Sequence, residues 1–259
     1  MHSQEKFTTT IKRYVVAFID VMGQKNDLSK IDVKWEAGAS DEEIQRLFEK
    51  TYGYITNFQT SMNNFFETFN KSLYDNVSSL DNKIDIAFPY QAFSDSYIVY
   101  FPMDCQNVFE RIEILFTGLR FIWLDCLSKR IPIRGAVEIG ACAPMHKFSG
   151  IYGGGIFRAT SLEHEHADWP RIVIGPCLKY FIKDVAITNL IEPEFMTDEN
   201  STNKIEFGFL KIPPIKTQEV KMISDIVSFC YEQIQNNDNN IIKEKYIKLL
   251  NYIKSCSCN

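Results

Sequence analysis

The chain has 259 residues, of which 45% are hydrophobic and 14% aromatic, enough to bury a sizeable core within one elaborated domain. Its net charge of −5 argues against a general nucleic-acid-binding protein, although a single nucleotide needs only a local basic cluster and metal ions. No apolar run reaches the roughly 18 residues of a membrane span, and the N-terminus lacks the apolar stretch of a signal peptide. The seven cysteines show no disulfide framework. We therefore expect a cytoplasmic protein that contacts neither membrane nor nucleic acid.

The first half of the chain predicts strands separated by two long helices. Residues 13–20 are an unbroken apolar run, which is typical of a buried strand. A helix is expected at 41–73, because Ser40 can cap it and apolar residues recur at helical spacing. The other elements of this half are two strands of a hairpin and a second long helix, at 84–93, 96–102 and 106–129.

The second half predicts shorter elements. Residues 150–155 form a glycine-rich turn, and residues 194–204 are a polar connection. Strands are expected at 131–143, 171–174 and 204–212, and helices at 156–166, 177–184, 217–235 and 239–255.

The order of these elements predicts an α+β fold. A strand, helix, strand, strand, helix, strand series is the arrangement of the ferredoxin-like palm. We expect a mainly antiparallel sheet, helices on one face and a helical C-terminal appendage. Residues 1–185 would form a catalytic domain, and the strand and helices of residues 186–259 would pack on that same domain.

Two aspartates lie at the ends of apolar strands. Asp20 ends the first strand, and Asp95 follows 75 residues later at the predicted hairpin turn. A carboxylate in such a place is costly to desolvate unless something pairs with it. Two of them predict a shared cation, as in nucleotidyl-transfer sites that hold two metal ions against a triphosphate. The simpler alternatives are a helix cap for Asp20 and a turn-forming role for Asp95.

Four segments in the expected order resemble the class III nucleotidyl cyclases. They match that family's first-strand motif, its Asp-bearing hairpin turn, its next strand and its later helix–strand unit. The segments are Phe18-Ile-Asp20-Val-Met-Gly23, Phe93-Ser-Asp95-Ser, Ile133-Arg-Gly-Ala-Val-Glu-Ile-Gly140, and Gly153-Gly-Gly-Ile-Phe-Arg-Ala-Thr-Ser-Leu-Glu163 with Trp169-Pro-Arg-Ile-Val-Ile174. The resemblance covers residues 13–175. In their residue sequences, these segments are more similar to the Pycsar anti-phage cyclases, the divergent bacterial branch that makes cyclic pyrimidine nucleotides.

The resemblance implies conversion of UTP or CTP to the 3′,5′-cyclic monophosphate and pyrophosphate. Asp20 and Asp95 would bridge two Mg²⁺ or Mn²⁺ ions, with the backbone carbonyl of Val21 as a further ligand. It also implies a head-to-tail homodimer with a shared active site. Its product would activate a separate effector in an antiviral response.

Several basic and glycine residues are candidates for binding the triphosphate. Arg134 lies in an apolar strand, where it could neutralise phosphate or pair with an internal carboxylate such as Glu138. A surface salt bridge is the simpler role for each of the other cations. Glycines before a helix can bring backbone N–H groups close to phosphate, although a tight turn would also explain them. These further candidates are Lys147, Gly153, Gly154, Arg158 and Arg171.

The sequence departs from the family at the positions that would recognise the base and at those that would stabilise the transition state. Purine cyclases usually carry an Asn and an Arg on the later helix, where this chain has Phe157 and Ser161, so Arg158 could supply the missing charge. The adenine-reading Asp is replaced by Gly150. We expect a cyclase for another base. The alternatives are a purine cyclase with unusual base readout and an inactive nucleotide sensor. The aromatic residues that could stack on the base are Phe7, Tyr14 and Tyr90.

Overall fold

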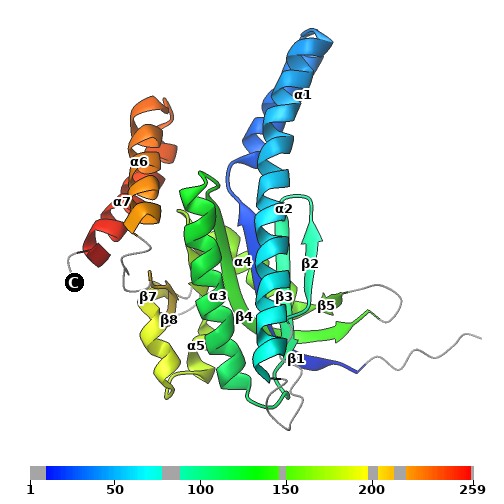
Figure 1. Cartoon of the computed structure of the whole chain (residues 1–259), viewed down its shortest axis with the longest axis vertical. Helices are drawn as coiled ribbons and strands as arrows, with labels where there is room; N and C mark the ends of the chain where they lie inside the picture. Colours follow the sequence, from blue (N-terminus) through cyan, green and yellow to red (C-terminus); the bar gives the residue numbers. More distant parts are fainter. Residues whose placement is uncertain (1–9, 78–87, 146–149, 198–203, 213–219, 258–259) are drawn as a thin grey trace, which may run out of the picture.

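The computed structural model describes residues 10–77, 88–145, 150–197, 204–212 and 220–257 (Figure 1). Its central strand is β1 (Lys12–Val21), the apolar run at the start of the chain. Because side chains alternate along a strand, Val15, Ala17 and Ile19 join the main apolar cluster on one face. Val16 and Phe18 belong to a smaller cluster on the other face.

Four strands and two helices form the palm. The strand order β2-β3-β1-β4, with antiparallel pairing throughout, is the order of a ferredoxin-like sheet, and it confirms the predicted α+β fold. The two connecting helices each follow one strand and return to the next. The elements are α2 (Asp41–Val77), β2 (Tyr90–Phe93), β3 (Ser96–Pro102), α3 (Val108–Ser128) and β4 (Ile133–Pro144).

Further strands extend the sheet beyond β4. The only parallel pair among the described strands joins β4 to β6 (Ile172–Ile174), so the sheet is mainly antiparallel as predicted. The strands β8 (Lys204–Leu210) and β7 (Ile191–Thr197) continue it, and β5 (Ile151–Gly153) pairs with the end of β4. Strand β7 corrects the prediction of a polar connection from residue 194. It is an edge strand, where Pro193 is tolerated and polar residues are common.

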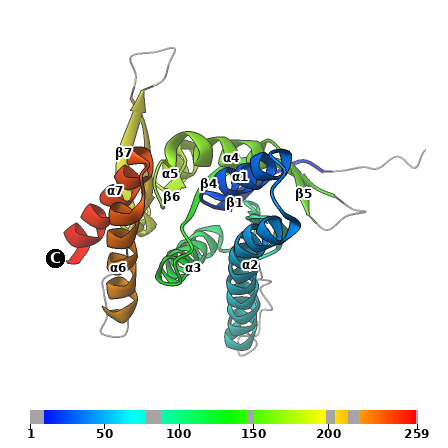
Figure 2. The same cartoon turned by 90° about the horizontal axis from the view of Figure 1, so that it is seen from above.

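Helices lie on both faces of the sheet, which corrects the prediction of helices on one face (Figure 2). The long helices α2 and α3 cover one face, where Phe58 and Trp123 are buried in the main cluster. Helix α4 (Gly154–His166) crosses the opposite face. It approaches closely because two glycines meet there: a Cβ placed on Gly140 would lie 2.3 Å from the Cα of Gly155.

A helical hairpin projects from the end of the sheet at which β1 stops (Figure 1). Its first arm, α1 (Gln24–Glu36), was not predicted. Ile31 is its only described apolar residue that is buried, so the sequence lacks a continuous apolar stripe there. The second arm is the start of α2, where the Glu43 backbone N–H donates to Ser40 Oγ at 3.3 Å, as expected for a cap.

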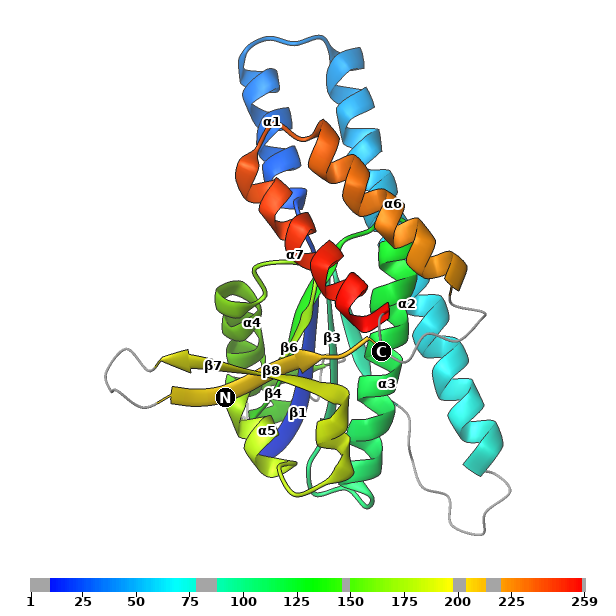
Figure 3. The ribbon, with the colours of Figure 1, turned by 90° about the vertical axis from the view of Figure 1, so that its left-hand side faces the viewer.

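The C-terminal region carries three more α-helices: α5 (Pro176–Phe181), α6 (Val220–Asn236) and α7 (Asn240–Ser257). Helix α6 packs on α3, and its Ile226 and Phe229 belong to the main apolar cluster. The Arg130 guanidinium, just after α3, donates two hydrogen bonds of 2.7 and 2.6 Å to the Glu232 carboxylate of α6, which strengthens this contact. Figure 3 shows α6 and α7 crossing the same end of the sheet as the α1–α2 hairpin. No helix of the described chain has the length and apolarity that crossing a membrane requires.

Candidate functional site

The two predicted aspartates lie beside each other at one end of the palm. Asp20 is opposite Ser96 in the β1–β3 ladder, and Asp95 is in the turn that precedes Ser96. The Val21 backbone N–H donates to the Asp95 carbonyl oxygen at 3.1 Å, which ties the turn to the end of β1. On the other side, Gln59 Nε2 donates to the Ser94 carbonyl oxygen at 2.7 Å. The fold therefore brings together residues that are 75 positions apart.

Arg134 joins these aspartates from the neighbouring strand. It is opposite Asp20 in the β1–β4 ladder, and its Nη2 lies 3.7 Å from Asp20 Oδ2. Its Nε forms an ion pair with Glu163 of α4, whose side chain is only 4% exposed. The sequence analysis left open whether Arg134 has an internal partner, and the structure identifies Glu163 in place of the suggested Glu138.

Glu138 has a different role in the fold. Its buried carboxylate accepts bonds from the backbone N–H groups of Cys177 at 3.2 Å and Leu178 at 2.9 Å. It therefore fixes the start of α5, and the three backbone donors around it, including Ile139 N at 2.7 Å, offset the cost of burying it.

Negative charge exceeds positive charge around Asp20. Burial, together with the nearby carboxylates of Glu163 and Asp95, raises the pKa of Asp20 to about 7, although Arg134 opposes the shift. Burial also raises the pKa of Glu163, again against Arg134. One guanidinium thus stands among three carboxyl groups. A bound cation would stabilise the ionised forms of these groups.

The donor set suits a hard divalent cation that also binds substrate. In the described part of the chain, no group of three or more His, Cys, Asp or Glu side chains is placed to hold a metal ion. Mg²⁺ does not need such a group, because it keeps several waters and is usually held by one or two carboxylates together with substrate phosphates. Asp20 and Asp95 fit that pattern, and they lack the nitrogen and sulfur ligands of a zinc site.

Glu163 is the site residue that the sequence analysis missed. It follows the buried Ala159 and Leu162 at helical spacing, so it belongs to the apolar face of α4. An acid on that face was the available signal, since buried carboxylates require a partner.

The predicted glycines and Arg158 lie away from the aspartates within one chain. Arg158 Nη1 donates to the Ile139 carbonyl oxygen at 3.4 Å and lies 3.6 Å from Cys177 Sγ. Ile139 is five residues along β4 from Arg134, roughly 16 Å at strand spacing. Gly153 and Gly154 form the junction of β5 and α4 near the Ala141 backbone, farther along the same strand.

Arg171 has its donors engaged elsewhere. Its guanidinium pairs with Glu194 at 2.8 Å and Asp168 at 3.0 Å, and it packs over the rings of Trp169 and Phe209. Its side chain is only 7% exposed. These contacts join β6, β7 and β8, so the structure gives Arg171 a structural role. Lys147, the remaining candidate cation, lies outside the described residues.

The residues considered for base recognition are also separated. Tyr90 stacks on Phe66 and Tyr97 in the palm core, and Tyr14 packs edge-on against Tyr100. Phe7 falls outside the described part of the chain. Gly150 has a φ of 140°, and a Cβ there would lie 2.3 Å from the side-chain oxygen of Gln91.

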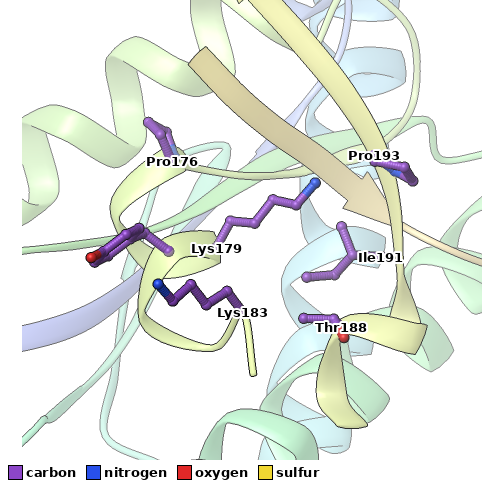
Figure 4. Close-up of a pocket in the computed structure, with 7 residues that line it drawn as sticks. Pro176, Lys179, Lys183, Thr188, Ile191 and Pro193 are labelled. Carbon is purple, nitrogen blue, oxygen red and sulfur yellow. The ribbon is translucent and has the colours of Figure 1, made fainter. Parts of the chain in front are cut away.

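Two hollows border these elements. A cleft of about 1040 Å³ lies between the α1–α2 and α6–α7 hairpins, and Met22, Gly23 and Pro132 of its lining directly adjoin the Asp20 end of β1. A smaller pocket of about 500 Å³ lies beside α5 and β7, away from the aspartates (Figure 4). There Lys179 Nζ donates to the Phe207 carbonyl oxygen at 3.0 Å.

Comparisons with known proteins give structural likenesses only. The sequence matches no protein-family model, and no curated protein matches it. Among solved structures, the adenylyl cyclase CyaB from P. aeruginosa is 15% identical, with 78% of this chain and 95% of that chain covered and a TM-score of 0.46. The catalytic core of a rhodopsin-guanylyl cyclase with converted specificity, in complex with ATPαS, is 11% identical. The alignment covers 78% of this chain and 97% of that chain, with a TM-score of 0.46. Likenesses at this level of identity and TM-score carry no conclusion about activity.

Proposed function

We propose that this protein is a nucleotidyl cyclase that converts UTP or CTP to the 3′,5′-cyclic monophosphate and pyrophosphate. The observation that carries the proposal is the cluster at one end of the palm: Asp20 and Asp95 on adjacent backbone segments, with Arg134 beside them. This cluster offers oxygen ligands for metal ions and a cation for phosphate at the same place. The four sequence segments that resemble class III cyclases give the reaction type.

Each residue of the cluster has a distinct part in this reaction. Asp20 and Asp95 would hold two Mg²⁺ or Mn²⁺ ions, with the Val21 backbone carbonyl as a third protein ligand. When bound, the ions lower the pKa of the ribose 3′-hydroxyl and stabilise the charge of the departing pyrophosphate. Arg134 would neutralise a phosphate oxygen. Glu163 keeps the Arg134 guanidinium in place from the α4 side.

The reaction is an internal displacement at the α-phosphorus. The 3′-oxygen forms a bond to phosphorus, the bond to the bridging oxygen of the β-phosphate breaks, and the 3′-hydroxyl proton leaves to solvent or a nearby base. Holding both ends of the nucleotide would supply much of the acceleration, because the reacting atoms must approach within about 3–3.5 Å.

We also propose a head-to-tail homodimer in which the site is completed by a second copy. Within one chain, Arg158 lies too far along β4 to reach a nucleotide at Asp20. Tyr152 and Phe157, close to Arg158 in the chain, are 76% and 73% exposed. Such large exposed aromatic residues are typical of a surface that a partner covers. Arg158, Gly153 and Gly154 of the partner subunit would then face the triphosphate.

The proposed pyrimidine preference is supported by the backbone at Gly150. Its φ of 140° favours glycine, and a side chain there would have to displace the Gln91 amide, so the position does not suit the adenine-reading aspartate. Adenine readout of the purine-cyclase kind is therefore absent. A site without a buried hydrogen-bond partner for one base loses discrimination in favour of that base.

A second candidate function is favoured by one observation. Phe157 and Ser161 stand where purine cyclases carry their Asn and Arg, so the chain could bind nucleotide without turning it over. The biological role is proposed from the sequence resemblance: residues 1–185 would generate an antiviral signal, residues 186–259 would pack on them, and a separate effector would respond.

The decisive experiment is incubation of the purified protein with equimolar ATP, GTP, CTP and UTP plus Mn²⁺, followed by mass spectrometry. We expect cyclic UMP or cyclic CMP as the main product. Mainly cyclic AMP or cyclic GMP would assign the chain to the purine cyclases. Absence of all four products, with nucleotide still bound, would establish the inactive sensor.

A further inference from the structure

The cleft between the α1–α2 and α6–α7 hairpins is separate from the proposed metal site. Asp20 is on the same side of β1 as Val16 and Phe18, which pack in the smaller cluster on the α4 face. The cleft is lined instead by Phe229 and Tyr246, which belong to the main cluster on the α2–α3 face. A ligand in the cleft and a nucleotide at the metal ions would therefore occupy different sites.

Two buried polar side chains line this cleft without a hydrogen bond of their own. Gln24, at the start of α1, is 6% exposed, and Tyr246 of α7 is 7% exposed. Neither the Gln24 amide nor the Tyr246 hydroxyl has a hydrogen-bond partner among the described residues. Their polar atoms are not among those fully enclosed without a partner, so they open onto the cleft. Such groups pair either with water or with the polar edge of a ligand.

The rest of the lining matches the chemistry of a nucleobase. Tyr54 and Phe229 place aromatic rings in the cleft, and the α6 side adds the neutral amides of Gln233 and Asn236. Aromatic side chains pack against bases, and an amide offers both a donor and an acceptor to the edge of a base. At about 1040 Å³, the cleft also has room for a ligand of nucleotide size.

One lysine of the lining is available for a phosphate group. The cleft is bordered by three lysines, and two of them have acidic partners, in the pairs Lys30–Asp27 at 2.9 Å and Lys34–Glu43. Lys50 is exposed, and it forms no ion pair within the part of the chain that the structure describes. A single free cation matches one phosphate group, whereas a triphosphate would bring more negative charge than this lining neutralises.

We propose that the cleft is a second nucleotide-binding site, which takes a nucleoside carrying one phosphate group. The base would pair with the Gln24 amide and the Tyr246 hydroxyl, and the phosphate would lie toward Lys50. The ligand would be held without being cyclised, because Asp20 and Arg134 lie on the other face of the sheet. Its chemistry is shared by ordinary 5′-monophosphates and by a 3′,5′-cyclic monophosphate. Only the second source, the enzyme's own product, rests on the proposed function.

The test is calorimetric titration of the full-length protein in EDTA with the 5′-monophosphates and the 3′,5′-cyclic monophosphates of all four bases. We expect at least one of these probes to bind at one site per chain. Tyr246→Phe and Gln24→Met each remove one neutral hydrogen-bonding group and should weaken binding by about threefold to tenfold. Lys50→Gln should weaken it by about tenfold, because a charged contact is lost at an exposed position where folding is not at risk.

Two control variants separate the cleft from other parts of the molecule. Tyr231→Phe removes a hydroxyl from α6 outside the cleft lining, where it accepts a bond from Lys254 at 3.1 Å, and should leave binding unchanged. Asp20→Asn should also leave it unchanged, since the metal site lies on the other face. Binding of the cyclic probes alone would identify the product as the ligand, and equal binding of the 5′-monophosphates would identify a cellular nucleotide. Either result supports the site.

The remaining outcomes distinguish this proposal from the proposed function. Absence of binding by every probe would overturn the second site. So would wild-type affinity in Tyr246→Phe, Gln24→Met and Lys50→Gln, or a loss in Asp20→Asn as large as theirs. If binding depends on the cleft residues while none of the four nucleoside triphosphates is cyclised, the second site stands and the cyclase proposal fails. If a triphosphate is cyclised but no monophosphate binds, the cyclase proposal stands and the second site fails.

Discussion

Three carboxyl groups around one guanidinium define this molecule at the scale of single residues. Asp20 is 19% exposed and Glu163 4%, so water screens them poorly. Arg134 cannot neutralise Asp20, Asp95 and Glu163 at once. A surplus of negative charge of this kind costs stability in the metal-free protein, and it is the arrangement from which a metal site gains affinity.

Removal of either aspartate should abolish turnover while the protein stays folded. Asp20→Asn and Asp95→Asn each take one charge from the proposed ligand pair. We expect cyclase rates to fall by more than about 100-fold, because even residues that only support a metal ligand cost about 10–100-fold. Asp104→Asn is the control, since Asp104 pairs with Lys12 on the surface. Full activity in either site variant, measured by product formation in Mn²⁺, would refute the two-metal site.

The same charge surplus predicts a pH-dependent gain in stability for Asp20→Asn. The pKa of Asp20 is about 7 in the folded protein, against an ordinary value of 3.8. Folding therefore favours the protonated form, and wild-type stability falls as pH rises from about 4 to about 7. Asparagine does not ionise, so the variant avoids this loss. At pH 8 in EDTA we expect it to be more stable than wild type by on the order of 1–3 kcal/mol.

Urea unfolding of both proteins at pH 4 and pH 8 measures this difference. Comparing the two proteins at each pH cancels the titration of the groups that do not interact with Asp20. A difference in unfolding free energy that is the same at both pH values would show that burial does not raise the pKa of Asp20.

Among single residues, those that the sequence made recognisable are charged residues within or at the end of an otherwise apolar strand. Asp20 and Arg134 interrupt apolar strands, and both lie in the cluster. Glu163 was missed, because an acid within a helix is ordinary until the packing of α4 is known. Arg171 was selected for its charge alone, although its partners Asp168 and Glu194 come from other parts of the chain.

At the scale of elements, the contact between β4 and α4 determines where Glu163 and Arg134 meet. The helix lies against the strand where Gly140 faces Gly155. The predicted strands and long helices of the palm were confirmed because their patterns are continuous. By contrast, α1 and β7 were not recognised: α1 buries little apolar surface, and β7 depends on pairing with β8.

Gly140→Ala should therefore destabilise the protein and disturb the site. A Cβ at Gly140 would lie 2.3 Å from the Cα of Gly155, which forces α4 away from the sheet. Overpacking of this kind costs about 1–3 kcal/mol, and it would also separate Glu163 from Arg134. Gly53→Ala is the control, because no atom lies within 4 Å of a Cβ there. On helix α2 that change should be neutral or stabilising by up to about 1 kcal/mol.

Equilibrium unfolding in urea gives both free energies of unfolding. Equal effects of Gly140→Ala and Gly53→Ala would mean that the α4–β4 contact is not close-packed.

At the scale of the whole molecule, two helical hairpins stand at the end of the sheet that holds the aspartates (Figure 1). The sequence predicted α6 and α7 as helices, but it could not place them. Their position depends on tertiary contacts such as those of Ile226 and Phe229 with the main cluster. The cleft between the hairpins was equally beyond a single-sequence analysis, because its lining comes from distant segments.

The proposed shared site makes activity a property of the pair of chains. We expect the protein to sediment as a dimer of about 60 kDa, twice the 30.0 kDa of one chain. Asp20→Asn chains lack the metal-binding half of the site, and Arg158→Ala chains lack the half that would come from α4. Each variant alone should be inactive. In a mixed dimer, one of the two sites would combine an intact Asp20 with Arg158 of the partner subunit.

Mixing the two inactive variants should therefore restore part of the activity. Random exchange at equal concentrations gives mixed dimers as about half of the population, each with one intact site, so about a quarter of the wild-type rate is expected. Mixing Asp20→Asn with Asp95→Asn is the control, because both changes would damage the same half of the site. In such a mixed dimer, both sites would have an intact α4 half, but each metal-binding half would carry one of the two substitutions. The rate should therefore stay at background. Recovery in this control would mean that Asp20 and Asp95 serve one site from different chains. Full specific activity in a diluted monomer, or no recovery in the mixture of Asp20→Asn with Arg158→Ala, would contradict the shared site and place every catalytic residue within one chain.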